Sequence, residues 1–189
     1  MGKLVITEFL TLDGVMEDPG GQSDWDRGGW AFRFDRGADG DKFKFDELMA
    51  ADVQLLGRRT YDGFAAAWPS MGQDEFGQKM NGMPKVVVST TLTDPEWENT
   101  TVIAGDLEHE IPALKGRYEG DILVAGSAQL VQSLLALGLV DEIRLMVFPI
   151  LLGEGKKLFA DEAPMAAFTL AESRQTGDCV TLVFVRAAE

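Results

Sequence analysis

Two short stretches of the 189-residue chain place a glycine between a compact apolar segment and a segment with helical spacing. Gly57 ends the predicted strand 53–57, and Gly126 follows the predicted strand 121–125. In chain order, the residues at the two junctions are Gly57, Arg58, Arg59 and Thr60, and then Gly126, Ser127 and Ala128. These residue types make both junctions candidate sites for a phosphate group.

The backbone explains why such junctions suit phosphate. The first turn of a helix has N–H groups without intrahelical partners, and the helix dipole makes this end positive. Glycine lets a ligand approach the backbone closely, and open α/β sheets bind ligands beyond the carboxyl ends of their strands. Two such junctions predict a site for the two phosphates of one dinucleotide, with a charge-assisted contact from Arg58 or Arg59. The alternative is structural, because glycine often ends a strand and arginine in a first helical turn is usually solvated.

A third stretch, "VVVSTTL" at residues 86–92, ends a β-branched run with three hydroxyl side chains. Ser89 and Thr90 follow the strand directly, where hydroxyls can bind a ribose or its 2′-phosphate. Hydroxyl residues after a strand are also ordinary loop formers, so this stretch alone does not decide between the two roles.

Several common catalytic and binding patterns are absent from the sequence. There is no G-x-G-x-x-G after a strand, no G-x-x-x-x-G-K-[ST], no H-E-x-x-H and no G-x-S-x-G. A serine–histidine–aspartate triad would need His109, the single histidine, which stands between carboxylates and is expected on a solvated face. One cysteine, Cys179, and one histidine exclude most zinc sites, and we expect no metal. Cys179 lies in an alternating strand pattern, which favours plain packing.

Composition narrows the classes of partner and compartment. The net charge is −14, from 17 basic and 31 acidic residues, which disfavours binding to nucleic acid or anionic lipid. No run of about 18 apolar residues predicts a membrane span, and the N-terminus does not have the pattern of a signal peptide. A single cysteine fits a reducing compartment, so we expect a cytoplasmic protein.

Apolar periodicity predicts strands that alternate with helices and a closing hairpin. The predicted strands are 3–10, 53–57, 84–92, 100–105, 121–126 and 140–150, and the predicted hairpin is 168–187. The predicted helices are 43–52, 58–68, 74–82, 106–116 and 127–138. Pro69 is expected to stop the second helix, and Ser127 and Gly138 to cap the last one. We expect an α/β fold with three α/β/α layers and a mostly parallel sheet that has an antiparallel C-terminal edge. The aromatic-rich segment 22–44 is expected to be an ordered loop that covers a pocket.

Five segments, in this order, resemble the dihydrofolate-reductase-like fold, in the branch formed by the C-terminal reductase domain of the bifunctional riboflavin-biosynthesis deaminase-reductase. They are "TLDGVM", "LLGRRTYDGF", "VVVSTTL", "ILVAGSAQLVQSLLALGLVDEIRL" and "PILLGEGKKLF". The resemblance spans nearly the whole chain and implies one domain over residues 1–189. It also implies NADPH as the cofactor, bound without the G-x-G-x-x-G fingerprint.

The resemblance implies roles for particular residues. The residues implied in cofactor binding are Gly57, Arg58, Arg59 and Thr60 at the adenine-side phosphates, Ser89 and Thr90 at the 2′-phosphate or adenosine ribose, and Gly126, Ser127 and Ala128 along the pyrophosphate and nicotinamide. The residues implied in substrate binding are Asp13, near the nicotinamide, and Leu152, Gly153 and Gly155 at the pocket rim.

The family's reaction is hydride transfer from nicotinamide C4 to the imine-like form of a ribosylamino pyrimidine. This implies a 5-amino-6-(5-phosphoribosylamino)uracil reductase of riboflavin biosynthesis. A carboxyl near the hydride acceptor would help protonation, and we expect Asp13 in this catalytic role before Glu47 or Asp46. Asp-Gly is also a common turn pair, so Asp13 has a structural alternative.

Three departures from the family pattern leave the substrate open. Gly126-Ser127 stands where the family often has a pair of glycines at the nicotinamide junction. The zinc signature of the deaminase half is absent, so we expect a stand-alone reductase, and the segment 22–44 is elaborated. A phosphorylated substrate would need cations nearby, and neighbouring aspartates dilute the candidates, which are Arg27, Arg33, Arg36, Lys42 and Lys44. A pterin or another small heterocycle is the first alternative, and a nucleotide-binding module without turnover is the second. The family implies a homodimer, for which the apolar run 145–152 would supply part of the interface unless it lies in the core.

Overall fold

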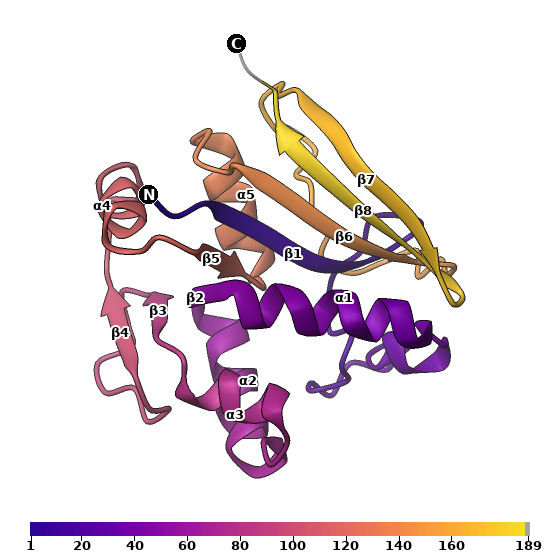
Figure 1. Ribbon diagram of the computed structural model, residues 1–189, viewed down its shortest axis with the longest axis horizontal. Coiled ribbons are helices and arrows are strands. Elements are labelled where there is room, and N and C mark those ends of the chain that lie inside the picture. Colours follow the sequence, from indigo (N-terminus) through magenta and orange to yellow (C-terminus); the bar gives the residue numbers. More distant parts are fainter. Residues whose placement is uncertain (188–189) are drawn as a thin grey trace.

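A computed structural model describes residues 1–187 of the chain, and these residues include one eight-stranded sheet. The strands are β1 (Leu4–Thr11), β2 (Ala51–Gly57), β3 (Lys85–Val88), β4 (Thr100–Ile103), β5 (Asp121–Val124), β6 (Glu142–Phe148), β7 (Phe168–Thr176) and β8 (Cys179–Arg186). Their order is β4-β3-β2-β5-β1-β6-β8-β7 (Figure 1). Neighbours among β1 to β6 pair in parallel, whereas β8 is antiparallel to both β6 and β7. The predicted mostly parallel sheet with an antiparallel C-terminal hairpin is confirmed.

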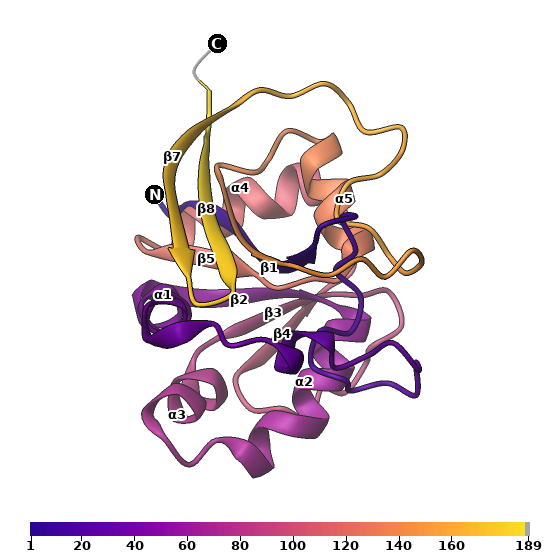
Figure 2. The same ribbon diagram turned by 90° about the vertical axis from the view of Figure 1, so that its right-hand side faces the viewer.

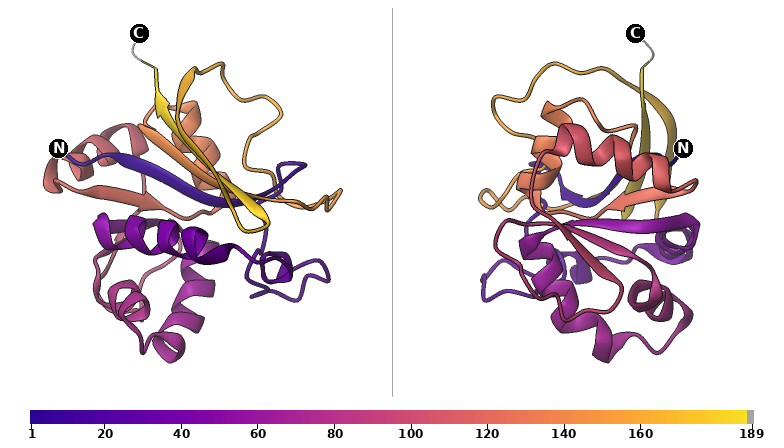
Figure 3. Two further views of the ribbon diagram at one scale, coloured as in Figure 1. Left: turned by 45° about the vertical axis from the view of Figure 1, so that its right-hand side comes forward. Right: turned by 90° about the vertical axis from the view of Figure 1, so that its left-hand side faces the viewer.

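Helices cover both faces of this sheet. They are η1 (Trp30–Arg33), α1 (Gly37–Ala50), α2 (Arg58–Met71), α3 (Glu75–Gly82), α4 (Leu107–Arg117) and α5 (Ala128–Ala136). Figures 2 and 3 show α4 and α5 on one side of the sheet and α1, α2 and α3 on the other. The three predicted layers are therefore present. Within residues 1–187, no helix combines the length and the apolar character that crossing a membrane requires.

Burial on both faces explains the continuous apolar runs of the central strands. In β1, Leu4 and Ile6 pack in the cluster that contains residues of α4 and α5, while Val5 packs in the cluster that contains residues of α1, α2 and α3. Successive side chains of a strand point to opposite faces, so a strand between two helical layers must be apolar on both. Polar residues inside such a strand are therefore exceptions that need a separate explanation.

The aromatic-rich segment 22–44 was predicted to be a loop, but it contains η1 and the first turns of α1. Trp30 is fully buried, packs edge-on against Phe148 at 5.3 Å between ring centroids, and donates from Nε1 to the Glu17 carbonyl at 2.8 Å. Gln22 and Phe32 line the cleft described below. One part of the segment thus fills a third core cluster, and another part borders the pocket.

Some predicted elements differ in their bounds from the observed ones. The strand predicted at 84–92 is the shorter β3, Lys85–Val88. Pro69 does not stop α2, which continues to Met71, and Pro112 lies inside α4. Proline removes one backbone donor but holds a helical φ, so an exposed helix can pass through it. The helix predicted at 43–52 is α1, which begins earlier, at Gly37. The prediction missed its first turns because they are too polar to show an apolar period.

The apolar run 145–152 lies mostly inside the protein. Leu145, Met146 and Phe148 belong to β6, which is hydrogen-bonded to β1 on one side and β8 on the other, and all three side chains are buried. Core packing therefore explains the apolar character of this strand. The homodimer stays a prediction.

Candidate cofactor and substrate cleft

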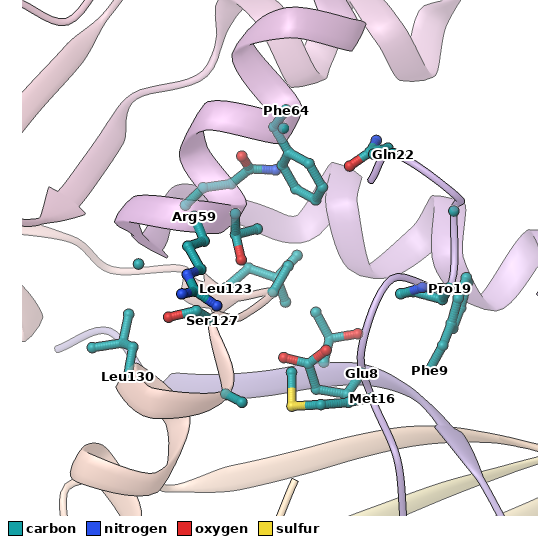
Figure 4. Close-up of a pocket in the computed structure, with 18 of the residues that line it drawn as sticks. Glu8, Phe9, Met16, Pro19, Gln22, Arg59, Phe64, Leu123, Ser127 and Leu130 are labelled. Carbon is teal, nitrogen blue, oxygen red and sulfur yellow. The ribbon is translucent and has the colours of Figure 1, made fainter. Parts of the chain in front are cut away.

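A cleft of about 2100 Å³ opens at the carboxyl ends of the central parallel strands. Its floor includes residues of β1 and β5, and its walls include the first turns of α2 and α5, parts of α1 and α3, and the loop after β1. Figure 4 shows side chains from these separate segments directed into one space. This is the position at which open α/β sheets bind their ligands.

The two glycine junctions meet in this cleft. The Gly57 N–H donates to the Gly126 carbonyl at 3.0 Å. A Cβ at position 57 would lie 2.3 Å from Ser127 Oγ, and one at position 126 would lie 2.8 Å from Thr60 Oγ1. Gly126 also has a φ of +93°, which other residues rarely adopt, and its peptide bond to Ser127 is cis. The two glycines thus allow the two junctions to pack directly against each other beside the cleft.

Both helices begin at these junctions without a capping side chain. Gly57, the N-cap residue of α2, has no side chain to cap the helix, and the side chain of Ser127, the N-cap residue of α5, accepts no hydrogen bond from the first turn. Ser127 therefore occupies the predicted N-cap position, but its side chain does not cap the helix. The N–H groups of two helix starts converge at the cleft, which is the arrangement that anions bind.

The two arginines have different surroundings. Arg58 Nε donates to both carboxylate oxygens of Asp62, at 2.8 and 2.9 Å, and its Nη1 lies 3.4 Å from Thr91 Oγ1. Arg59 is exposed, and within residues 1–187 it forms no ion pair. Figure 4 shows its guanidinium extending toward Ser127. Arg59 is therefore the cation at this junction that is free to meet an anion.

The hydroxyl cluster after β3 lines the same cleft. The Oγ of Ser89 accepts from the backbone N–H groups of Thr91 and Leu92, at 3.2 and 3.1 Å, while Thr90 is exposed. Ser89, Thr90 and Thr91 all line the cleft, and Thr91 lies beside Arg58. The structure thus brings the predicted cofactor residues of the three strand ends to one cavity.

Asp13 and the loop 152–155 form a separate group that is not part of the cleft lining. The Asp13 carboxylate accepts from the Gly153 N–H at 2.6 Å, from the Leu152 N–H at 3.3 Å and from the Thr11 hydroxyl at 2.6 Å. The Thr11 hydroxyl, helped by these backbone N–H groups, lowers the pKa of Asp13. A Cβ on Gly155 would lie 2.7 Å from Val15 Cγ1. In this arrangement the predicted substrate residues join two loops to each other beside the cleft.

The two further predicted carboxyls differ in burial. Asp46 is at the rim of the cleft and pairs with Lys42. Glu47 is buried, accepts from the Thr7 hydroxyl at 2.7 Å and forms an ion pair with Lys44. Of the two, Glu47 is the carboxyl that lies inside the cleft.

Glu8 is a site residue that sequence reasoning missed. Its side chain is buried, lines the cleft, and has an Oε1 with no hydrogen-bond partner within the described residues. Burial raises its pKa well above the ordinary value. The alternating pattern "KLVITEFL" suggested a half-exposed strand, in which a glutamate would be ordinary. Only the strand order shows that β1 is central and that Glu8 is a buried acid.

Comparison with known proteins agrees with this geometry. The sequence model of the RibD C-terminal domain family matches residues 2–182. The uncharacterized protein YyaP of Bacillus subtilis (strain 168) is 31% identical over 164 residues, which are 84% of this chain and 81% of YyaP.

Solved structures share the fold. A protein from Shewanella sp. PV-4 that is named as a riboflavin biosynthesis protein superimposes with a TM-score of 0.76 and 21% identity. The match covers 98% of this chain and 99% of that chain. RibD of Acinetobacter baumannii superimposes with a TM-score of 0.68 and 18% identity, over 100% of this chain and 59% of that chain. The family match and the fold together show that the chain belongs to the RibD C-terminal domain family.

Proposed function

We propose that the cleft binds NADPH and that the chain is a reductase that transfers a hydride to a small heterocyclic substrate. One observation supports this most strongly. The uncapped N-termini of α2 and α5 converge where Gly57 is hydrogen-bonded to Gly126, and Arg59 lies beside them without an ion-pair partner among residues 1–187. Converging N–H groups and a free guanidinium are what a pyrophosphate group binds.

The residues of the cleft fit a dinucleotide. The first turns of the two helices would hold the pyrophosphate between them, at the helix starts that Gly57 and Gly126 allow to pack closely together. Arg58, Ser89 and Thr90 would hold the adenosine ribose and its 2′-phosphate at the end of β3. When bound, the cofactor supplies the hydride, while this chain binds it, orients it and excludes water.

The substrate we propose first is 5-amino-6-(5-phosphoribosylamino)uracil, the type that the family implies. Cations at the cleft, among them Arg36 and Lys44, support a phosphorylated substrate. Arg36 pairs with Asp41 and Lys44 pairs with Glu47, which reduces the availability of both cations. A pterin-like substrate is the alternative, which the buried carboxyl of Glu47 inside the cleft supports, since a carboxyl can hold the ring edge of a pterin by hydrogen bonds.

Thermal-shift and calorimetric titrations with NADPH, NADP and NADH test the cofactor. A ligand at 100 times its dissociation constant adds about 2.7 kcal/mol of stability, so selective stabilisation by NADPH is the expected result. No stabilisation by any of the three would remove the proposed reductase function. Light scattering of the same sample reports whether the chain forms the homodimer that we propose from the family.

A substrate panel then separates the functions, with loss of nicotinamide absorbance as the readout. Oxidation of NADPH with the ribosylamino pyrimidine supports the riboflavin type, and oxidation with a dihydropterin supports the alternative. For the pterin alternative, Glu47→Gln should weaken binding of a folate analogue because Glu47 is buried in the cleft. Asp46→Asn should leave this binding unchanged. Cofactor binding without turnover of any compound would instead support a nucleotide-binding module.

A further inference from the structure

Glu8 is a buried acid at the floor of the cleft. It lies on β1, between β5 and β6, and is only 8% exposed. A Cβ on Gly126 would lie 3.8 Å from Glu8 Oε1 and 3.7 Å from the terminal methyl of Met16. Figure 4 shows the carboxyl beside Met16, on the same open space as Ser127 and Arg59. Glu8 therefore borders the junction to which we assign the pyrophosphate and nicotinamide end of the cofactor.

Burial, rather than the neighbouring charges, favours the protonated form of Glu8. The charged groups facing it are Lys44 and Glu47, both on α1, and these two form an ion pair with each other. From α2 and the loop after β1, the neighbouring side chains at Gly126 are the uncharged Thr60 and Met16. Burial raises the pKa of Glu8, Glu47 raises it further, and Lys44 opposes both effects. Glu8 thus keeps its proton at pH values at which an exposed glutamate is ionised.

One oxygen of the Glu8 carboxyl makes no hydrogen bond within the described residues. Oε1 of Glu8 is buried and has no hydrogen-bond partner among residues 1–187. Buried polar atoms are almost always satisfied, and an exception in a cleft indicates a group that is completed by a ligand. The buried Oε2 of the neighbouring Glu47 also has no partner among residues 1–187, but Glu47 differs from Glu8 because Lys44 and the Thr7 hydroxyl occupy its Oε1.

We propose that Glu8 is the catalytic residue that delivers the proton during reduction of a carbon–nitrogen double bond in this cleft. This inference rests on the proposed reductase function. The hydride from the reduced nicotinamide adds to the carbon, and the π electron pair moves to the nitrogen. The O–H bond of Glu8 breaks as the new N–H bond forms, so that nicotinamide is oxidised and the double bond is reduced. The Glu8 carboxylate regains a proton from water after product release.

The other carboxyls at the cleft are less suited to this role. Asp13 accepts three hydrogen bonds that hold its charged form, and its pKa is lowered. Asp46 is exposed and paired with Lys42. A proton donor needs an acid that is neutral at the working pH and within reach of the substrate, and Glu8 meets both conditions.

The test uses three variants of the full chain. Glu8→Gln keeps the shape of the side chain and removes the transferable proton, and Glu8→Asp keeps an acid with one methylene fewer. Glu172→Gln, on the exposed strand β7, is the matched control. The probes are methylpyrroline, as a simple cyclic imine, a dihydropterin and the ribosylamino pyrimidine, each with NADPH. Carbon-13 NMR of glutamate-labelled protein follows the titration of the Glu8 carboxyl without any substrate.

The expected result has four parts. Glu8→Gln binds NADPH as the wild type does, loses turnover of the reducible probe by about 100-fold or more, and Glu8→Asp recovers part of it. The wild-type kcat falls as pH rises through the pKa of Glu8, and this dependence disappears in Glu8→Gln. One labelled carboxyl titrates well above the others and is missing only in the Glu8 variants. The wild-type reaction, but not that of Glu8→Gln, slows in deuterium oxide.

Two results overturn the proposal in distinguishable ways. If the wild type reduces a probe and Glu8→Gln has the same kcat, or if the Glu8 carboxyl titrates with the exposed glutamates, then Glu8 is not the proton donor although the reductase function stands. If the wild type fails to bind NADPH or reduces no probe, the reductase function fails and the role of Glu8 falls with it.

Discussion

Gly57 and Ser127 lie so close together that position 57 has no room for a side chain. A Cβ there would be 2.3 Å from Ser127 Oγ and 2.9 Å from the Ser127 backbone nitrogen. The two residues begin different helices from neighbouring strands, β2 and β5. Their contact therefore fixes the separation of the two helix starts, and with it the width of the site that we assign to the pyrophosphate.

Replacing Gly57 by alanine should push these helix starts apart. We expect Gly57→Ala to lower the free energy of unfolding by about 1 to 3 kcal/mol, the usual cost of overpacking, and to weaken NADPH binding further than this loss explains. Urea unfolding and calorimetric titration measure the two effects. Gly82→Ala is the control, since a Cβ at position 82 has no neighbour within 4 Å. A Gly57→Ala protein with unchanged NADPH affinity would contradict the assignment of this junction.

The two arginines should contribute to different parts of the cofactor. Arg59→Ala removes the guanidinium near Ser127 and should weaken the binding of NADPH and NADH alike, by about 10- to 150-fold, because a charge-assisted hydrogen bond contributes about 1.5 to 3 kcal/mol. Arg58→Ala removes the cation beside Thr91 and should weaken NADPH more than NADH. Calorimetry with both cofactors measures the ratio, and the exposed Arg117→Ala is the control. Equal loss for both cofactors in Arg58→Ala would show that Arg58 does not bind the 2′-phosphate.

Local patterns made the glycine junctions predictable from sequence. Gly57 and Gly126 stand out because an apolar strand, a glycine and a helix start follow one another within a few residues. The alternation of strands and helices likewise predicted the layers and the mostly parallel sheet. These features depend on neighbours in the chain, so periodicity and residue type are sufficient to find them.

Features that depend on the strand order were not predictable in this way. Glu8 becomes a buried acid only because β1 lies between β5 and β6, and the pairing of Glu47 with Lys44 depends on α1 covering that strand end. Asp13 was expected beside the substrate, whereas its carboxylate bonds to Gly153, which is 140 positions along the chain. Contacts over such distances follow from the fold and leave no local signal.

Asp13 provides a direct comparison of a catalytic and a structural role. We expect Asp13→Asn to lower the melting temperature, because the amide is a weaker acceptor for the Leu152 and Gly153 N–H groups and the Thr11 hydroxyl. The pKa of Asp13 is lowered in the folded state, so its contribution to stability is present above its ordinary pKa and is lost as pH falls. The difference in melting temperature between wild type and variant should therefore shrink in acid. Unchanged stability with loss of turnover would instead support the catalytic role predicted from the sequence.

Lys85 is a buried cation whose loss should be costly. It is 1% exposed, its ammonium donates to the carbonyls of Asn81, Met83 and Glu98, and it lies 4.2 Å from the centroid of the Trp97 ring. Lys85→Met would leave three carbonyls without this donor, and we expect a loss of about 2 to 4 kcal/mol in the free energy of unfolding.

Urea unfolding followed by tryptophan fluorescence measures the effect of Lys85→Met, with the exposed Lys157→Met as the control. Because Trp97 contacts the ammonium, the native emission should change as well. A loss no larger than that of Lys157→Met would show that water or neighbouring groups satisfy these carbonyls.

Glu8 should make the protein less stable as pH rises. The pKa of Glu8 is raised in the folded state, mainly by burial, so above its ordinary pKa the unfolded chain releases this proton while the folded chain keeps it. Its contribution to stability is therefore full below the ordinary pKa and is lost as pH rises toward the folded value. Glu8→Gln has no such proton and should show no such loss.

The melting temperatures of Glu8→Gln and wild type should accordingly converge near pH 4 and separate as pH rises, with the variant the more stable at pH 8. Glu172→Gln should follow the wild type at every pH, because its carboxyl is exposed. The comparison needs no substrate and no cofactor, so it tests the buried acid independently of the reaction. A constant difference between Glu8→Gln and wild type across this range would mean that Glu8 is ionised in the folded protein, and that the cleft holds a carboxylate rather than an acid.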